Sequence, residues 1–127
     1  MNISNTLVMD IIEILKYFLP ITIIDNFDLV KIDEFLNDNG KEMHLFFDEK
    51  YQHPESYPEN SLESKGFHKA FHINDFPIQN KKVKLCIRKR RWIDKQTNKI
   101  FSKSYDFKHK GTSYSKGLAY FLKGGVR

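Results

Sequence analysis

The sequence predicts an α+β fold, in which an N-terminal helix packs on a small antiparallel β-sheet of hairpins and a short helix ends the chain. Apolar residues recur at helical spacing between Leu7 and Leu19, with charged residues on the other face. From Phe27 the spacing becomes that of strands, and the turn sequence Asn-Asp-Asn-Gly at residues 37 to 40 divides two such segments. A basic hairpin after residue 80 and an apolar helical face after Gly111 complete the prediction.

The totals favour one small cytoplasmic domain, which we place over residues 1–127. The 11 Phe and 6 Tyr supply enough large apolar groups for a core. The single cysteine, Cys86, excludes an intramolecular disulfide and suits a reducing compartment. No segment reaches the roughly 20 consecutive apolar residues that span a bilayer, so we expect no membrane contact. The first ten residues carry only Asp10 as a charge, which does not fit a secretion signal.

The N-terminal helix has signals at both of its ends. Asn5 or Thr6 caps its start, and Pro20 limits its end because proline disfavours helical backbone in the preceding residue. A second, weakly marked helical turn is expected near Ile21 to Asn26.

The strands of the first part follow from residue type and alternation. Phe27 to Leu36 and Met43 to Phe47 are rich in β-branched and aromatic residues, which predicts a hairpin. Tyr51 to Asn60 holds two of the four prolines and has no periodicity, so it is expected to be a loop. Gly66 to Ile73 alternates and predicts a further strand.

In the last part, a strand starting near residue 81 directs Val83, Leu85 and Ile87 to a core. The polar residues 94 to 99 reverse the chain, with Asn98 suited to a left-handed conformation. Residues 100 to 107 then form the partner strand. After Gly111, Thr112 or Ser113 caps the terminal helix, which Gly124 and Gly125 stop.

Charge divides the chain into two unequal parts. Residues 1–79 hold 6 Lys and 14 Asp or Glu, a net charge of −8, whereas residues 80–127 hold 15 Lys or Arg and 2 Asp, a net charge of +13. We therefore describe an acidic part, 1–79, with the helix and first hairpin, and a basic part, 80–127, with the second hairpin and terminal helix. A block as basic as the second part is typical of a surface that binds a polyanion.

The candidate DNA-binding residues lie in this basic part. Arginine matches phosphate oxygens or a guanine edge, lysine adds non-specific attraction, and the indole either stacks on a base or braces the hairpin. The set consists of Arg88, Lys89, Arg90, Arg91, Trp92, Lys95, Lys99, Lys103, Lys108 and Lys110. Strand alternation places Arg88, Arg90 and Trp92 on one face and Lys89 and Arg91 on the other.

A family resemblance rests on short matches in a fixed order: the opening helix ending in Phe-Leu-Pro, then Ser64 to His68, Asn74 to Pro77, Arg88 to Trp92 with Thr97 to Lys99, and Lys110 to Thr112. In this order they resemble the N-terminal-region proteins of ISAon-type bacterial insertion-sequence transposases, which are related to the ISL-three group. The resemblance implies a non-catalytic, DNA-binding front part that acts at transposon ends. Its implied partner is a downstream catalytic transposase domain with an acidic triad, often in a separate reading frame. With Cys86 alone, a version without the zinc knuckle of the wider group is implied, so we expect no cofactor and no metal.

Three alternatives remain open on the sequence. The basic hairpin could dock on the acidic part of its own chain, with Trp92 as a core anchor, or the chain could be an interaction or regulatory module that docks on the catalytic subunit. A nuclease-like magnesium site would need Glu63 and Lys65 on one face of a buried strand, with Asp48 beside it.

Other catalytic or metal sites are weakly indicated. His68 and His72 have the spacing of zinc ligands on a helix, but on a strand their α-carbons would lie roughly 13 Å apart. No phosphate-binding glycine loop or serine nucleophile motif occurs in the sequence. We therefore expect no enzymatic activity.

Overall fold

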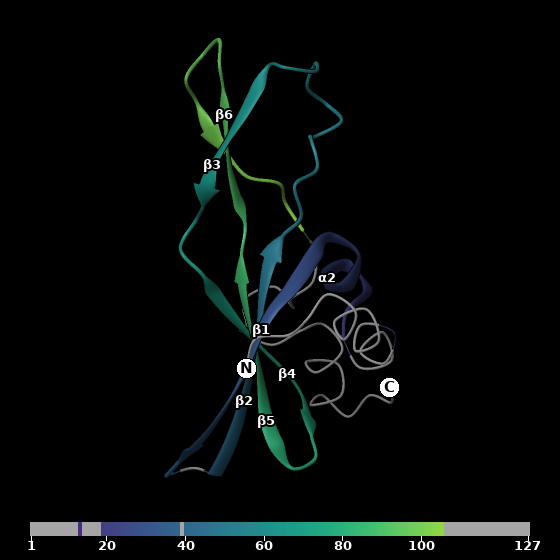
Figure 1. The fold of residues 1–127 in the computed structure, drawn as a ribbon, viewed down its shortest axis with the longest axis vertical. Coiled ribbons are helices and arrows are strands. Elements are labelled where there is room, and N and C mark those ends of the chain that lie inside the picture. Colours follow the sequence, from purple (N-terminus) through teal and green to yellow (C-terminus); the bar gives the residue numbers. More distant parts are fainter. Residues whose placement is uncertain (1–12, 14–18, 39, 106–127) are drawn as a thin grey trace.

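The computed structural model describes residues 13, 19–38 and 40–105, apart from the side chain of Phe76. It is mostly β-structure in two sheets that lie end to end along the long axis (Figure 1). The elements, in chain order, are α2 (Ile21–Asn26), β1 (Phe27–Asn37), β2 (Gly40–Glu49), β3 (Leu62–Phe67), β4 (Phe71–Ile78), β5 (Lys81–Arg88), β6 (Arg90–Asp94) and β7 (Ile100–Phe101). The larger sheet has the order β1-β2-β5-β4 and the smaller one β3-β6-β7.

The predicted first hairpin is confirmed. β1 pairs antiparallel with β2 from Phe27 opposite Glu49 to Asn37 opposite Gly40. Gly40 has a φ of +110°, which a residue without a β-carbon adopts at low cost, so the turn sequence explains where the chain reverses. A register shift between Leu29 and Lys31 shows a bulge in β1.

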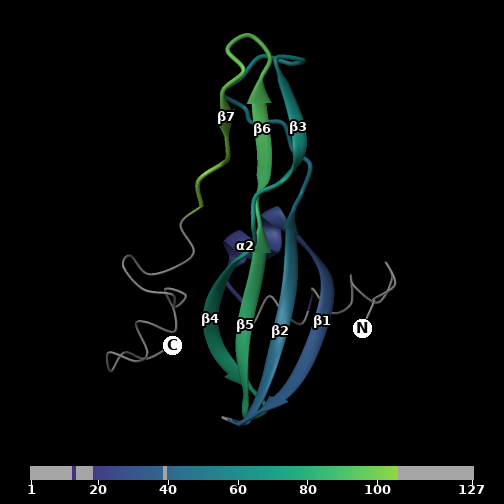
Figure 2. The ribbon, with the colours of Figure 1, turned by 90° about the vertical axis from the view of Figure 1, so that its left-hand side faces the viewer.

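The main core lies on one face of the larger sheet. Val83, Leu85 and Ile87 on β5 are buried, as the alternation predicts. They lie on the same face of the sheet as Leu45 and Phe47 of the neighbouring β2. The short helix α2, at the weakly marked position, covers this face with Ile23 and Ile24 (Figure 2). Cys86 is also buried, on the opposite face, and burial raises the pKa of its thiol, so it has the character of a packing residue.

The expectation of a purely antiparallel sheet is wrong for one pair of strands. β2 and β5 run parallel, from Glu42 opposite Lys82 to Asp48 opposite Arg88. The connection between them, residues 50–80, leaves the larger sheet, forms β3 and returns through β4, so β5 enters in the direction of β2. A parallel pair needs such a long crossover, and no local pattern reports it.

The expected strand over Gly66 to Ile73 is also corrected. β3 ends at Phe67 and β4 begins at Phe71, because Gly66, with a φ of +69°, forms a bulge against β6 and the chain crosses from one sheet to the other. On the partner side β5 and β6 are separated at Lys89 alone, whose carbonyl accepts a 2.8 Å hydrogen bond from the His68 N–H. One long two-stranded ribbon therefore belongs to both sheets (Figures 1 and 2).

Residues with a left-handed backbone conformation form the turn between β4 and β5 and the turn between β6 and β7. Gln79 and Asn80, with φ of 50° and 63°, make a two-residue turn between β4 and β5, which the sequence did not predict as a hairpin. Asn98, with φ of 57°, is left-handed as predicted, and β7 pairs with β6 beyond it. The partner strand is shorter than expected: β7 ends at Phe101, and residues 102–105 are not in a strand.

The predicted N-terminal helix, apart from Glu13 and Leu19, and the predicted C-terminal helix lie outside the described residues. No helix in the described ranges is long and apolar enough to cross a membrane.

Candidate nucleic-acid interface

The first of the predicted arginines is neutralised within the chain. Arg88 Nε and an Arg88 Nη each donate a 2.7 Å hydrogen bond to the two carboxylate oxygens of Asp48. The parallel pairing of β2 and β5 sets these two residues side by side. The carboxylate raises the pKa of the guanidinium, and the pair holds both strands together at the end of the larger sheet.

Arg90 is bound through its backbone as well as through its side chain. Its backbone N–H donates a 2.8 Å hydrogen bond to Glu49 Oε1, and its Nε donates one of 3.0 Å to the Glu49 carbonyl oxygen. The guanidinium lies between two rings, 5.1 Å from the centroid of Tyr51 and 4.8 Å from that of Phe67. This half-buried position directs the cation to the interior of the fold.

Glu49 is only 2% exposed and has a second partner. The Tyr105 hydroxyl donates a hydrogen bond to Glu49 Oε2. Burial, and then this hydrogen bond, raise the pKa of Tyr105 well above its ordinary value. A buried carboxylate needs such donors, and this one joins the end of β2, the start of β6 and the segment after β7.

Trp92 forms the centre of a second, smaller core. Its side chain is 1% exposed, and its ring lies 5.5 Å from that of Tyr51 and 6.2 Å from that of His53. The loop of residues 50–61 brings these rings over the inner face of the smaller sheet, and Tyr57 stacks on Phe101 of β7 at 4.7 Å. The indole therefore braces the hairpin, which is one of the two roles that the sequence allows, and is not available for stacking on a base.

Lys89 also contacts the chain itself. It lies between β5 and β6, is half-buried, and its Nζ donates a 3.1 Å hydrogen bond to the Lys103 carbonyl oxygen. Arg88, Lys89, Arg90 and Trp92 thus have structural roles. For Arg88, Arg90 and Trp92 the arrangement matches the alternative in which the basic hairpin docks on the acidic part of its own chain.

Three further cations of the predicted set, Arg91, Lys95 and Lys99, differ from Arg88 and Arg90 in their surroundings. Because Trp92 points inward, Arg91 points to the outer side of β6, and the two lysines lie in the exposed turn between β6 and β7. None of the three has a carboxylate partner within the part of the chain that the structure describes. These are the predicted residues that remain available to a ligand.

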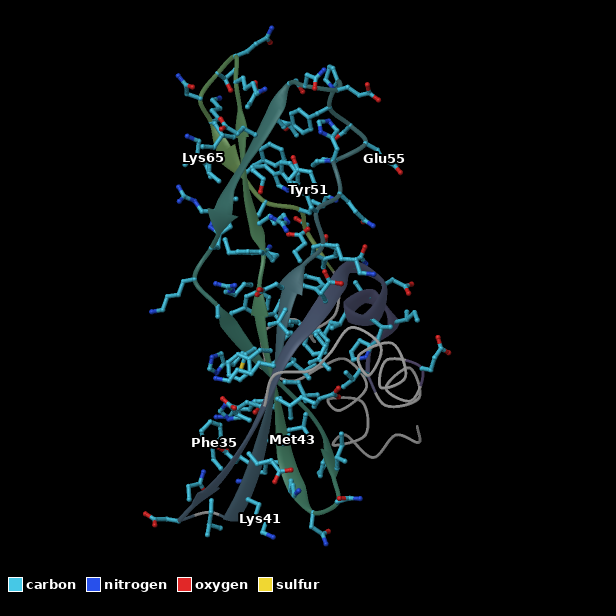
Figure 3. The ribbon with its side chains drawn as sticks, viewed as in Figure 1. Phe35, Lys41, Met43, Tyr51, Glu55 and Lys65 are labelled. Atoms are coloured by element: carbon cyan, nitrogen blue, oxygen red, sulfur yellow. The ribbon has the colours of Figure 1, made fainter. Side chains whose placement is uncertain are left out.

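Lys65 of β3 joins them, although the sequence analysis assigned it only to the nuclease alternative. Ser64 pairs with Trp92 on the inner side, so Lys65 points to the outer side and is exposed. Figure 3 shows Lys65 and Tyr51 on opposite sides of the smaller sheet. We use the name outer basic face for Lys65 and Arg91, which lie on the outer side of the strands, together with Lys95 and Lys99 of the exposed turn between β6 and β7. Glu63 is the one acidic side chain of the described strands β3, β6 and β7 on that side.

The remaining predicted residues are Lys103, Lys108 and Lys110. Lys103 lies beyond β7 and lines a cleft on the other side of the smaller sheet. Lys108 and Lys110 lie outside the described residues.

The residues of the nuclease and histidine alternatives do not come together. Asp48 holds Arg88 in the larger sheet, whereas Glu63 pairs opposite Ile93 in the smaller one. His68 lies in the break between β3 and β4, and His72 lies on β4. Within the described ranges, no group of three or more His, Cys, Asp or Glu side chains is placed to hold a metal ion.

Comparison of the chain with protein-family models, with curated proteins and with solved structures finds no match. The transposase resemblance therefore stays a prediction.

Proposed function

We propose that this chain binds DNA without catalysing chemistry on it, and that the outer basic face makes the contact. The observation that carries the proposal is the division of the basic residues into those bound within the chain and those left without a carboxylate partner. Arg88 and Arg90 are bound to Asp48 and Glu49. The exposed Lys65, Lys95 and Lys99 and the half-buried Arg91 have no carboxylate partner among the described residues, and Glu63 and Asp94 are the acidic residues of the same strands. A group of like charges without internal partners favours a polyanionic ligand.

The shape of this face favours duplex DNA. The turn between β6 and β7 lies at one end of the molecule (Figure 1), and the tip of a β-hairpin can enter the major groove of B-form DNA. The large rings of the smaller sheet, those of Tyr51, Phe67 and Trp92, pack on its inner side. Proteins that bind single strands use exposed rings as stacking platforms. Here Trp92 is buried and Phe67 is half-buried, while Tyr51, although 68% exposed, lies against the Trp92 ring and the Arg90 guanidinium. Phosphate contacts are thus the main expected source of affinity.

The biological setting of the proposal comes from the family resemblance. It makes the ends of a transposon the DNA that is bound and a downstream catalytic domain the partner, in the cytoplasm. The charge pattern on its own supports attraction to any DNA sequence, since phosphate contacts carry no sequence information.

The salt dependence of binding to a short duplex tests the proposal. If four cations neutralise four phosphates, the logarithm of the affinity falls against the logarithm of the salt concentration with a slope of about −3.6. The Lys95→Gln/Lys99→Gln variant is expected to reduce the steepness of this slope by about 1.8, because each lost phosphate contact removes about 0.9.

Lys41→Gln is the matched control. Lys41 is an exposed lysine on β2 at the opposite end of the molecule (Figure 3), and its loss leaves the slope unchanged if the outer basic face is the site. Equal effects of both variants, or no duplex binding at low salt, would reject the proposal. If an acidic protein then bound to the same face in the absence of DNA, the interaction-module alternative would replace it.

A further inference from the structure

A cleft separate from the outer basic face lies beside the second core. It has a volume of approximately 800 Å³ and lies between the loop of residues 52–57 and the segment of residues 101–105. The loop covers the inner side of the smaller sheet, so the cleft lies on the side opposite Lys65 and Arg91.

The polar groups of the cleft suit an anion. Ser56, Ser102 and Ser104 line it, together with Lys103. The Lys103 backbone is held in place by the hydrogen bond from Lys89 to its carbonyl oxygen. Lysine ammonium and serine hydroxyl groups are donors of the kind that bind a phosphate.

The acidic groups near the cleft do not cancel this attraction. Glu49 contacts the segment of residues 101–105 through Tyr105, but its carboxylate is buried and accepts hydrogen bonds from the Tyr105 hydroxyl and from the Arg90 backbone. Glu55 is the carboxylate within the described lining, and its side chain is exposed and points away from the body of the molecule (Figure 3).

The cleft also offers aromatic surface. Tyr57 and Phe101 both line it, are both only half-buried, and stack on each other with an angle of 18° between their planes. The loop that carries Tyr57 is fixed by His53, whose Nε2 lies 3.0 Å from the Tyr57 carbonyl oxygen. A planar ring in the ligand can pack against this pre-formed pair at little cost in conformational entropy.

We propose that this cleft binds a phosphate ester that carries a planar base, with Lys103 and the serine hydroxyls on the phosphate and the Tyr57–Phe101 pair beside the base. The ligand is a free nucleotide or the phosphorylated end of a nucleic-acid strand, since both present the same chemistry. The site is independent of duplex binding by the outer basic face.

Titration of the full chain with adenosine 5′-monophosphate, followed by amide chemical shifts, tests the proposal. We expect saturable shifts of residues 53–57 and 101–105, and binding at least about tenfold weaker for adenosine, because loss of a charge-assisted contact costs that much or more. Lys103→Gln is expected to weaken the nucleotide about tenfold, and Tyr57→Leu to weaken it as well while inorganic phosphate is unaffected.

Lys99→Gln is the matched control, because this lysine lies on the outer basic face, and it should leave nucleotide binding unchanged while weakening duplex binding. Lys103→Gln should show the reverse. A second arm compares an oligonucleotide with a 5′-phosphate and one with a 5′-hydroxyl: preference for the first identifies a strand end, and equal weak binding of both identifies the free nucleotide. No saturable shifts at millimolar nucleotide, or equal affinity of the parent chain and Lys103→Gln, would overturn the proposal whatever the result for duplex DNA.

Discussion

Arg90 and Glu49 contact each other twice, through the Arg90 N–H to the Glu49 carboxylate and through the Arg90 guanidinium to the Glu49 carbonyl. Glu49 is the last residue of β2 in the larger sheet, and Arg90 is the first residue of β6 in the smaller one. The pair therefore fixes one sheet to the other. Arg90 is predicted from the sequence as a DNA contact, but together with Glu49 it forms the joint between the two sheets.

Replacing Glu49 tests this joint. Glu49→Gln keeps the shape but removes the charge and one of the two acceptor oxygens that Arg90 and Tyr105 use. We expect the free energy of unfolding to fall by about 1–3 kcal/mol, the cost of unsatisfied buried polar groups. Urea denaturation measures it. Glu55→Gln, the same change at an exposed loop position, should stay within about 0.5 kcal/mol of the parent. Equal stability of the two variants would show that the joint contributes nothing.

The raised pKa of Tyr105 predicts a loss of stability at high pH. In the unfolded chain this hydroxyl titrates near 10.0, and in the folded chain it keeps its proton to higher pH. The unfolded state therefore binds fewer protons above pH 10, and the stability contributed by the group falls as the pH rises beyond that value. Denaturation of the parent and of Tyr105→Phe at several pH values measures the difference. The stability of the parent should fall more steeply than that of the variant, and parallel curves would contradict the hydrogen bond to Glu49.

Trp92 is the only tryptophan of the chain, so its fluorescence reports on one site. Because the indole is 1% exposed, we expect a blue-shifted emission and weak quenching by iodide in the folded chain. Saturating duplex DNA should leave the emission nearly unchanged. Strong quenching by DNA would place the indole against bases and would contradict the bracing role.

Neighbouring arginines are expected to respond in opposite ways to the same substitution. Arg91→Gln should reduce the steepness of the salt slope of duplex binding by about 0.9 and leave stability within about 0.5 kcal/mol. Arg90→Gln should instead lower stability by about 1–3 kcal/mol, since it removes the cation between two rings and a hydrogen bond to Glu49. Salt titration and urea denaturation of both variants measure the contrast. If both lost DNA affinity alike without a change in stability, the assignment of Arg90 to the scaffold would be wrong.

Local signals in the sequence predicted local structure. The Asn-Asp-Asn-Gly turn, the alternation of Val83, Leu85 and Ile87, and the left-handed Asn98 all describe backbone preferences that act over a few residues. The sequence did not predict the break between β3 and β4, because the break depends on the crossing of the ribbon from one sheet to the other. Gly66 by itself does not predict such a crossing.

The sequence by itself determined the strand-forming segments, their turns, and a basic block in which neighbouring residues face opposite sides. Only the tertiary structure decided which cations remain available. Asp48 lies 40 residues from Arg88 and Glu49 lies 41 from Arg90, and the parallel register of β2 and β5 brings them together. Composition sets the charge of a segment, but whether a charged side chain is neutralised depends on its distance from an opposite charge. The long crossover between β2 and β5 sets that distance, and local sequence patterns do not predict it.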